Sequence, residues 1–255
     1  MLPRLTVPAW EKTIPGLLHG FLGRGGGVSV AVFAELNLSV RVGDADGAVR
    51  ENWRRVRHMV GDEMQVATMR QVHGAEVATV SPAASDAGEA DALVAQEPGV
   101  VLSVLTADCV PLLLVAPREH VVAAVHAGWR GTLGGVAVRT IEHLTTRFGV
   151  DPAGLYAALG PAIGSCCFEV DREIAESMQA RWGDVPDAVL PGKHKAKAYL
   201  DLRRANAALL TRAGVSVDRI VSVGPCTRCA THQYFSHRAA GGTTGRQLSF
   251  IGWRA

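Results

Sequence analysis

Three residues that can bind a soft metal ion lie at the ends of apolar segments of the sequence. They are His73 in RQVHG, Cys109 in LTADCVP and His126 in AAVHAGWRG. Two imidazoles and one thiolate form a ligand set that suits zinc, and three protein ligands leave a fourth position open for water or substrate. Catalytic zinc has such an open position, whereas structural zinc has four protein ligands. The trio therefore predicts a catalytic metal centre, with a plain buried thiol and two ordinary histidines as the alternative.

Two glycine-rich segments have the composition of anion-binding loops. HAGWRG leads directly into a helix expected to begin near Thr132, and the first N–H groups of a helix attract anions. Arg130 in that segment would add a bidentate donor for phosphate or carboxylate. In HGFLGRGGGVS, Arg24 stands beside three glycines, although the pattern is neither a Walker nor a Rossmann motif. An ordinary tight turn is the alternative interpretation of both segments.

The other four cysteines are not predicted to bind a metal. Cys226 and Cys229 in CTRC have C-x2-C spacing, and His232 follows closely. A structural zinc site needs four ligands, and the sequence has no second C-x2-C or H-x3-H pair to complete one. We therefore expect no second zinc site there, and we assign no chemistry to the adjacent thiols Cys166 and Cys167. An odd total of five cysteines also argues against a disulfide framework.

Apolar runs of strand length must hold these residues in place. The runs at 100–106, 111–116 and 120–126 predict neighbouring buried strands, because short polar breaks separate them. Further strands are expected at 64–71, 75–80, 155–159, 219–223 and 248–251. Helical spacing and start signals predict helices at 48–60, 132–148, 171–182 and 201–213. The pattern predicts a single domain over residues 1–255, an α/β (α+β) sandwich of mixed β-sheets flanked by helices.

The composition limits the classes of function. Of the 255 residues, 48% are hydrophobic and 20% are charged, which is ordinary for a globular protein. The formal net charge of only +2 does not support nucleic-acid binding through bulk electrostatics. The most apolar stretch, 100–116, is interrupted by Thr106, Asp108 and Pro111, so we expect no membrane span. The N-terminal segment contains prolines and no apolar signal region, so we expect a cytoplasmic protein.

The motifs together resemble one protein family over nearly the whole chain. In order, HGFLGRGGGVS, ELNLSVRVGD, RQVHGAEV, ADALV, LTADCVPLLL, HAGWRGT, ALGPAIGSCCFEV, CTRC and YFSHR are similar to the bacterial YfiH/YlmD-like family. That family is described both as laccase-type polyphenol oxidases and as purine nucleoside phosphorylases. The resemblance implies a fold like the catalytic domain of cytotoxic necrotizing factors. It also implies zinc held by the residues that match the family's ligands, which are His73, Cys109 and His126.

The same resemblance implies a zinc-dependent enzyme that acts on purine nucleosides. One reaction would be phosphorolysis of adenosine, inosine and methylthioadenosine to the free base and a (methylthio)ribose 1-phosphate. The other would be deamination of adenosine, in which zinc activates a water that attacks the purine C6. The small-molecule partners would thus be purine nucleosides and phosphate.

Several residues are expected to assist these reactions. Asp108, beside Cys109, is our candidate acid/base, with hydrogen bonding to a metal ligand as the alternative role. Arg24, Arg130 and the N-terminus of the helix near Thr132 would bind phosphate. Phe235 or its neighbour Tyr234 would stack on the purine, although an aromatic residue in such a run is more often part of a core.

Other functions stay open at this point. A laccase needs a multicopper cluster, and none of the nine histidines forms a His-x-His pair, so we expect at most copper in the zinc position. In an amidase, Cys109 would be a catalytic nucleophile with His73 or His126 as its base. A structural zinc in a binding module would need a fourth ligand. The sequence predicts neither the preferred nucleoside nor the oligomeric state.

Overall fold

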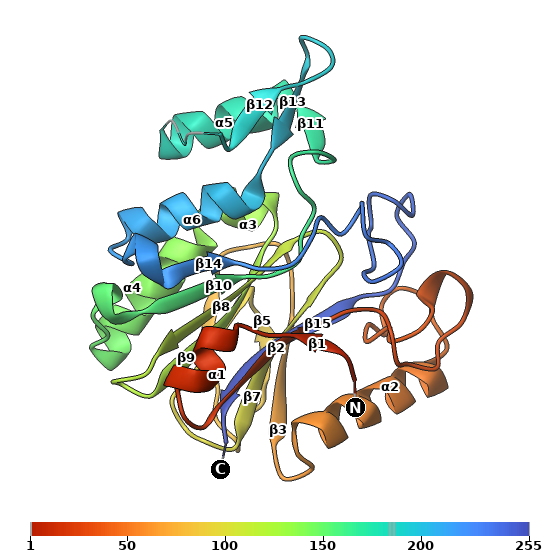
Figure 1. Ribbon diagram of the computed structural model, residues 1–255, viewed down its shortest axis with the longest axis vertical. Helices are drawn as coiled ribbons and strands as arrows, with labels where there is room; N and C mark the ends of the chain where they lie inside the picture. Colours follow the sequence, from red (N-terminus) through yellow and green to blue (C-terminus); the bar gives the residue numbers. More distant parts are fainter. Residues whose placement is uncertain (1, 184, 186, 255) are drawn as a thin grey trace.

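Two six-stranded mixed β-sheets pack face to face at the centre of the computed structural model, which describes residues 2–183, 185 and 187–254 (Figure 1). The first sheet has the strand order β1-β2-β15-β7-β3-β5. Its strands are β1 (Arg4–Leu5), β2 (Leu17–Leu22), β15 (Gln247–Trp253), β7 (Val100–Thr106), β3 (Gln65–Arg70) and β5 (Asp86–Glu89). The second sheet has the order β14-β10-β8-β9-β6-β4. Its strands are β14 (Ile220–Ser222), β10 (Tyr156–Leu159), β8 (Val110–Ala116), β9 (Val121–Ala127), β6 (Ala92–Ala95) and β4 (Val77–Thr79).

Helices cover the outer faces of both sheets. Helix α2 (Asp46–Val60) packs its apolar face on the first sheet, and α3 (Trp129–Gly134), α4 (Val136–Phe148) and α6 (Leu202–Arg212) cover the second. The short α1 (Pro8–Thr13) precedes β2. Helix α5 (Arg172–Trp182) and a small sheet of β11 (Glu169–Asp171), β13 (Lys197–Leu200) and β12 (Val189–Pro191) stand at one end of the molecule (Figure 1). The predicted architecture of mixed sheets flanked by helices is confirmed.

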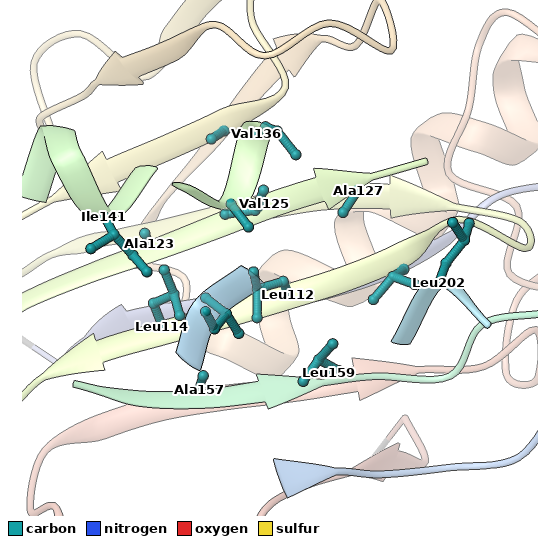
Figure 2. Close-up of a cluster of buried hydrophobic side chains, with 14 of the residues drawn as sticks. Leu112, Leu114, Ala123, Val125, Ala127, Val136, Ile141, Ala157, Leu159 and Leu202 are labelled. Atoms are coloured by element: carbon teal, nitrogen blue, oxygen red, sulfur yellow. The ribbon is translucent and has the colours of Figure 1, made fainter. Parts of the chain in front are cut away.

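Strand β8 shows why the central runs are apolar at nearly every position. Its side chains alternate between the two faces of the sheet. Leu112 and Leu114 point to the cluster beneath the helices (Figure 2), whereas Leu113 and Val115 point to the other sheet. Both faces are buried, so a strand in this position needs apolar residues throughout. An ordinary amphipathic strand alternates apolar and polar residues, whereas these runs are apolar throughout, and this difference makes them recognisable in the sequence.

The predicted elements differ from the structure in two respects. The helix expected at 132–148 is two helices, because Gly135 adopts a left-handed conformation with φ of 81° that ends α3 and begins α4. The sequence patterns also did not predict β1, β2, β5, β6 or the three strands of the small sheet, and all of these except β2 have four residues or fewer. No helix among the described residues is long and apolar enough to cross a membrane.

Buried His19, on β2, makes the stability of the fold depend on pH. Its Nε2 atom accepts a hydrogen bond from the backbone N–H of Val7 at 2.9 Å, which requires the neutral ring. Burial is the main cause that lowers the His19 pKa from 6.5 to about 4. In the unfolded chain the ring takes up a proton below its ordinary pKa. The neutral ring therefore stabilises the fold fully above pH 6.5, and that contribution is lost as the pH falls towards 4.

We expect this histidine to account for the loss of about 2 kcal/mol in the free energy of unfolding between pH 8 and pH 5. Denaturant unfolding of the wild type and of His19→Gln at both pH values measures the effect. The glutamine does not titrate, so the wild-type protein should lose that much more stability than the variant. An equal loss in both proteins would contradict the assignment.

Candidate active site and metal centre

The fold brings His73, Cys109 and His126 together. Their potential ligand atoms all lie within 4.8 Å of one another. Cys109 directly precedes β8 and His126 is near the end of β9, and the antiparallel register pairs Val110 with Ala127. That register places Cys109 beside the end of β9. His73 reaches the same point from the loop after β3, and its ring meets the His126 ring edge to face with centroids 4.8 Å apart.

Gly128 lies against the side chains of Cys109 and His73 and has no side chain that would displace them. A Cβ atom at this position would lie 2.9 Å from the Cys109 sulfur and 3.2 Å from Cδ2 of His73. Only glycine therefore permits this approach without displacing a ligand side chain. The glycine of HAGWRG thus serves the candidate metal centre as well as the turn into α3.

Asp91 is a fully buried carboxylate that organises the trio, and the sequence analysis missed it. Its Oδ1 atom accepts a hydrogen bond from Nδ1 of His126 at 2.7 Å and from the backbone N–H of His73 at 3.0 Å. Its Oδ2 atom accepts from the N–H of Gly74 at 2.6 Å and of Val72 at 3.2 Å. Because a carboxylate can only accept, Nδ1 of His126 carries a proton, and Nε2 is the nitrogen that a metal would bind in place of a second proton.

The same carboxylate holds the His73 loop in an uncommon conformation. His73 has φ of 61°, a region that residues other than glycine rarely adopt. The three backbone donors to Asp91 keep the loop in this state, which costs on the order of 1–3 kcal/mol. Asp91 could have been noticed in the sequence only through the ADALV segment of the family resemblance.

The charges in the trio stabilise one another. Burial by itself raises the pKa of the Cys109 thiol, but the neighbouring His126 and His73 rings lower it to about 6. Burial also opposes a charge on His126, but the Cys109 sulfur and the Asp91 carboxylate raise its pKa to about 9. A thiolate is therefore available near neutral pH, and a thiolate is what a metal ligand or a nucleophile requires.

These residues fit a zinc ion. The donor set is one thiolate and two imidazoles, and their spacing allows all three to reach a common centre. The pairing of Asp91 with His126 matches the carboxylate–histidine arrangement that orients metal-binding imidazoles. Three protein ligands leave a fourth position, and all three ligands also line a cavity. The geometry thus fits a catalytic rather than a structural metal.

That cavity, of about 920 Å³, is large enough for a nucleoside. Its wall combines cationic side chains with aromatic rings. The arginines are Arg41, Arg57, Arg70, Arg130, Arg238 and Arg246, and the rings are Trp53, Trp129 and Phe168. Of these residues only Arg130 had been predicted, because the others become neighbours of the trio only through the tertiary fold.

Asp108 lines the cavity, and both of its carboxylate oxygens are engaged. Oδ1 accepts from the Thr227 hydroxyl at 2.6 Å, and Oδ2 accepts from the backbone N–H of Arg238 at 2.7 Å. Asp108 also has φ of 86°, a strained conformation one residue before Cys109. The carboxylate therefore ties the segment 227–238 to the start of β8, beside the metal ligands.

Arg24 and Phe235 are not brought to the cavity, which corrects two predicted substrate contacts. Arg24 donates to the backbone oxygens of Ala34 and Thr231, and its guanidinium carbon lies 4.8 Å from the centre of the Phe235 ring. The Phe235 ring is fully buried, and Tyr234 is 6% exposed. Arg24 and Phe235 instead join the N-terminal loop to the C-terminal segment through these contacts.

The helix after HAGWRG starts earlier than the predicted position near Thr132, and the anion site expected at its start stays a prediction. The helix begins at Trp129, and the Thr132 N–H already donates to the Gly128 oxygen. The Thr132 hydroxyl is buried and accepts a hydrogen bond from Asn206. Arg130 does line the cavity, with its guanidinium carbon 4.3 Å from the centre of the Trp129 ring.

Comparison with known proteins identifies the family of the chain. Residues 18–254 match the family model described as multi-copper polyphenol oxidoreductase laccase. The chain belongs to this family. The YlmD and YfiH proteins are its relatives, so the resemblance found in the sequence is confirmed. The chain is 38% identical to "Purine nucleoside phosphorylase YlmD" of Geobacillus stearothermophilus over 94% of its own length and 91% of that protein.

Other members of the YfiH/YlmD family extend the comparison. The chain is 36% identical to "Adenosine deaminase RL5" from an unknown prokaryotic organism, covering 86% of this chain and 87% of that one. The crystal structure of YlmD from Geobacillus stearothermophilus superimposes with a TM-score of 0.88 at 36% identity, covering 95% of this chain and 93% of that one. The relatives' names identify a family of purine nucleoside phosphorylase and adenosine deaminase-like proteins, and they support an enzyme. The likeness to cytotoxic necrotizing factors stays a prediction.

Proposed function

We propose that this protein is a zinc-dependent purine nucleoside enzyme with one catalytic domain over residues 1–255. It would convert adenosine, inosine and methylthioadenosine, with phosphate, to the free base and a (methylthio)ribose 1-phosphate, and would also deaminate adenosine. The observation that carries the proposal is the group of three potential metal ligands, His73, Cys109 and His126, at the wall of a cavity lined with arginines and aromatic rings. The names of the relatives support the substrate class.

Phosphorolysis needs a phosphate held beside the ribose C1′. A phosphate oxygen attacks C1′ while the bond from C1′ to the purine nitrogen breaks and the base leaves with the bonding electrons. Arg130 and Arg238 can bind the phosphate, since a guanidinium presents paired N–H donors to its oxygens. The purine would stack on the rings of Trp129 and Phe168, which line the cavity.

Deamination needs an attacking water and a proton donor at the purine amino group. When bound to His73, Cys109 and His126, zinc supplies a Lewis acid that activates water near neutral pH. We propose Asp108 as the acid/base that moves the proton, because its carboxylate borders the cavity beside Cys109. In addition, its bonds to Thr227 and Arg238 hold the phosphate-binding segment in position.

Product analysis of adenosine tests the proposal. We expect adenine and ribose 1-phosphate only when phosphate is present, and inosine with or without it. Chromatography of the nucleosides and bases, with an assay of ribose 1-phosphate, separates these products. If neither product forms with the metal-loaded protein, the proposed function is wrong.

Arg130→Ala sharpens the test. We expect the KM for phosphate to rise by about tenfold to a hundredfold, because the arginine binds phosphate in the ground state as well as in the transition state. Deamination should change much less, since it uses no phosphate. Arg50→Ala on the exposed side of α2 is the matched control. Equal losses in both reactions would contradict a phosphate-binding role for Arg130.

A second candidate function rests on the thiolate of Cys109. Its lowered pKa and its two histidine neighbours also fit a cysteine nucleophile with a histidine base, as in an amidase. A hydrolytic activity on amides that needs neither phosphate nor metal would favour that function.

The laccase alternative would place copper at the same trio. Among the described residues, the other group of potential metal ligands consists of cysteines alone and offers no imidazole.

A further inference from the structure

The fold gathers the four cysteines outside the active site into one cluster. Cys166 and Cys167 lie between β10 and β11, and Cys226 and Cys229 follow β14. Their sulfur atoms all lie within 4.8 Å of one another. The prediction of no zinc site at the C-x2-C pair rests on the absence of a second such pair from the sequence. The structure overturns that reason, since the adjacent thiols of the other loop supply the missing ligands.

The sulfur spacing matches a tetrahedral metal site. With zinc–sulfur bonds of about 2.3 Å, the sulfurs of a zinc site with four cysteines are about 3.8 Å apart. The Cys229 sulfur lies 3.5 Å from that of Cys167 and 3.7 Å from that of Cys166. A disulfide would need a separation of about 2.0 Å. One cysteine therefore stands between two others, at distances that a shared metal requires and a disulfide does not.

The surroundings of the cluster are suited to thiolates. The backbone N–H of Gly164 points at the Cys226 sulfur, with a distance of 3.2 Å. The Arg228 side chain interacts with Cys167 from within the C-x2-C loop. Four thiolates around one divalent ion have a net charge of −2. The Gly164 N–H and the Arg228 guanidinium offset part of that charge. Cys166 and Cys229 are exposed, so an ion can reach the cluster from solvent.

We propose that Cys166, Cys167, Cys226 and Cys229 bind a second zinc ion, which is structural. Four protein ligands complete a tetrahedron and leave no position for substrate. The ion would join the loop 161–168 to the loop 224–230. These loops already meet beside the cluster, where the Thr227 N–H donates a hydrogen bond to the Ala162 oxygen.

This second ion would also support the active site. Thr227 stands directly after Cys226, and its hydroxyl is the donor to Asp108. The cluster therefore fixes the residue that holds Asp108 in its strained conformation beside Cys109. The proposal does not depend on the reaction that the active site performs, because it concerns a separate set of ligands.

Metal analysis of the full-length protein tests the proposal. The protein, purified under reducing conditions, should contain two zinc ions per chain, and Cys226→Ser and Cys229→Ser should each contain one. Cys109→Ser should also contain one, held by the four-cysteine cluster. His232→Ala is the matched control, because this histidine follows the cluster in sequence but is not among its ligands. Its zinc content should equal that of the wild type.

Cobalt gives a readout that does not depend on activity or on zinc retained during purification. The metal-free Cys109→Ser variant, titrated with Co²⁺ without oxygen, should develop strong thiolate-to-cobalt charge-transfer absorption and the visible bands of a tetrahedral site. The same titration of a Cys109→Ser, Cys229→Ser double variant should lose most of that absorption, and circular dichroism checks that it is folded. If Cys109→Ser develops no thiolate absorption, or if the double variant develops as much, the proposal is wrong.

Discussion

Replacing His126 with alanine should lower the zinc content by one ion per chain and reduce nucleoside turnover by a thousandfold or more, on the order expected for loss of a catalytic metal. His126 is the one ligand that is almost fully buried, and Asp91 fixes its orientation. Its removal therefore takes away the best-positioned donor of the trio. Cys109→Ser should have the same effect on both measurements.

Elemental analysis and the adenosine assay check this result together. His58→Ala is the matched control, since this histidine of α2 is exposed and pairs with the exposed Asp62. The wild-type protein stripped of metal by a chelator separates the two roles of Cys109, because it retains the thiol and lacks the ion. Full turnover by that metal-free protein would show that Cys109 acts as a nucleophile and that the zinc proposal is wrong.

Asp91→Asn should weaken metal binding at the trio by about tenfold to a hundredfold, the range typical of residues that orient a metal ligand. Burial opposes the charge of Asp91, but the hydrogen bond and the charge of His126 keep the pKa of this carboxyl below its ordinary value, so it stays ionised at neutral pH. An amide in its place can donate as well as accept. It would then favour the other imidazole tautomer, in which Nε2 carries the proton and cannot bind the ion.

Competition with a metal chelator measures the affinity of this variant. Asp62→Asn, an exposed change on the surface, is the matched control. Because Asp91 also accepts three backbone hydrogen bonds, circular dichroism and thermal unfolding should establish that the variant is folded. A folded Asp91→Asn protein with wild-type affinity would mean that the carboxylate shapes the loop without orienting the ligand.

The central part of the fold was predictable because strands that are buried on both faces appear in the sequence as continuous apolar runs. Strands β7, β8 and β9 sit where apolar runs of strand length predicted them, and α2, α5 and α6 follow from helical spacing. The small sheet of β11, β12 and β13 was not predictable. Its strands are short and partly exposed, so pairing between them depends on neighbours rather than on a pattern of their own.

The sequence by itself determined which side chains could bind a metal, because ligand chemistry belongs to the residue type. His73, Cys109 and His126 could therefore be recognised in their motifs. Only the tertiary structure decided what each group meets. The buried carboxylate of Asp91, the cover over Phe235 and the four-cysteine cluster all join segments that are distant in sequence, and such contacts depend on strand register and loop conformation. A C-x2-C pair cannot reveal that two adjacent cysteines from another loop will complete it.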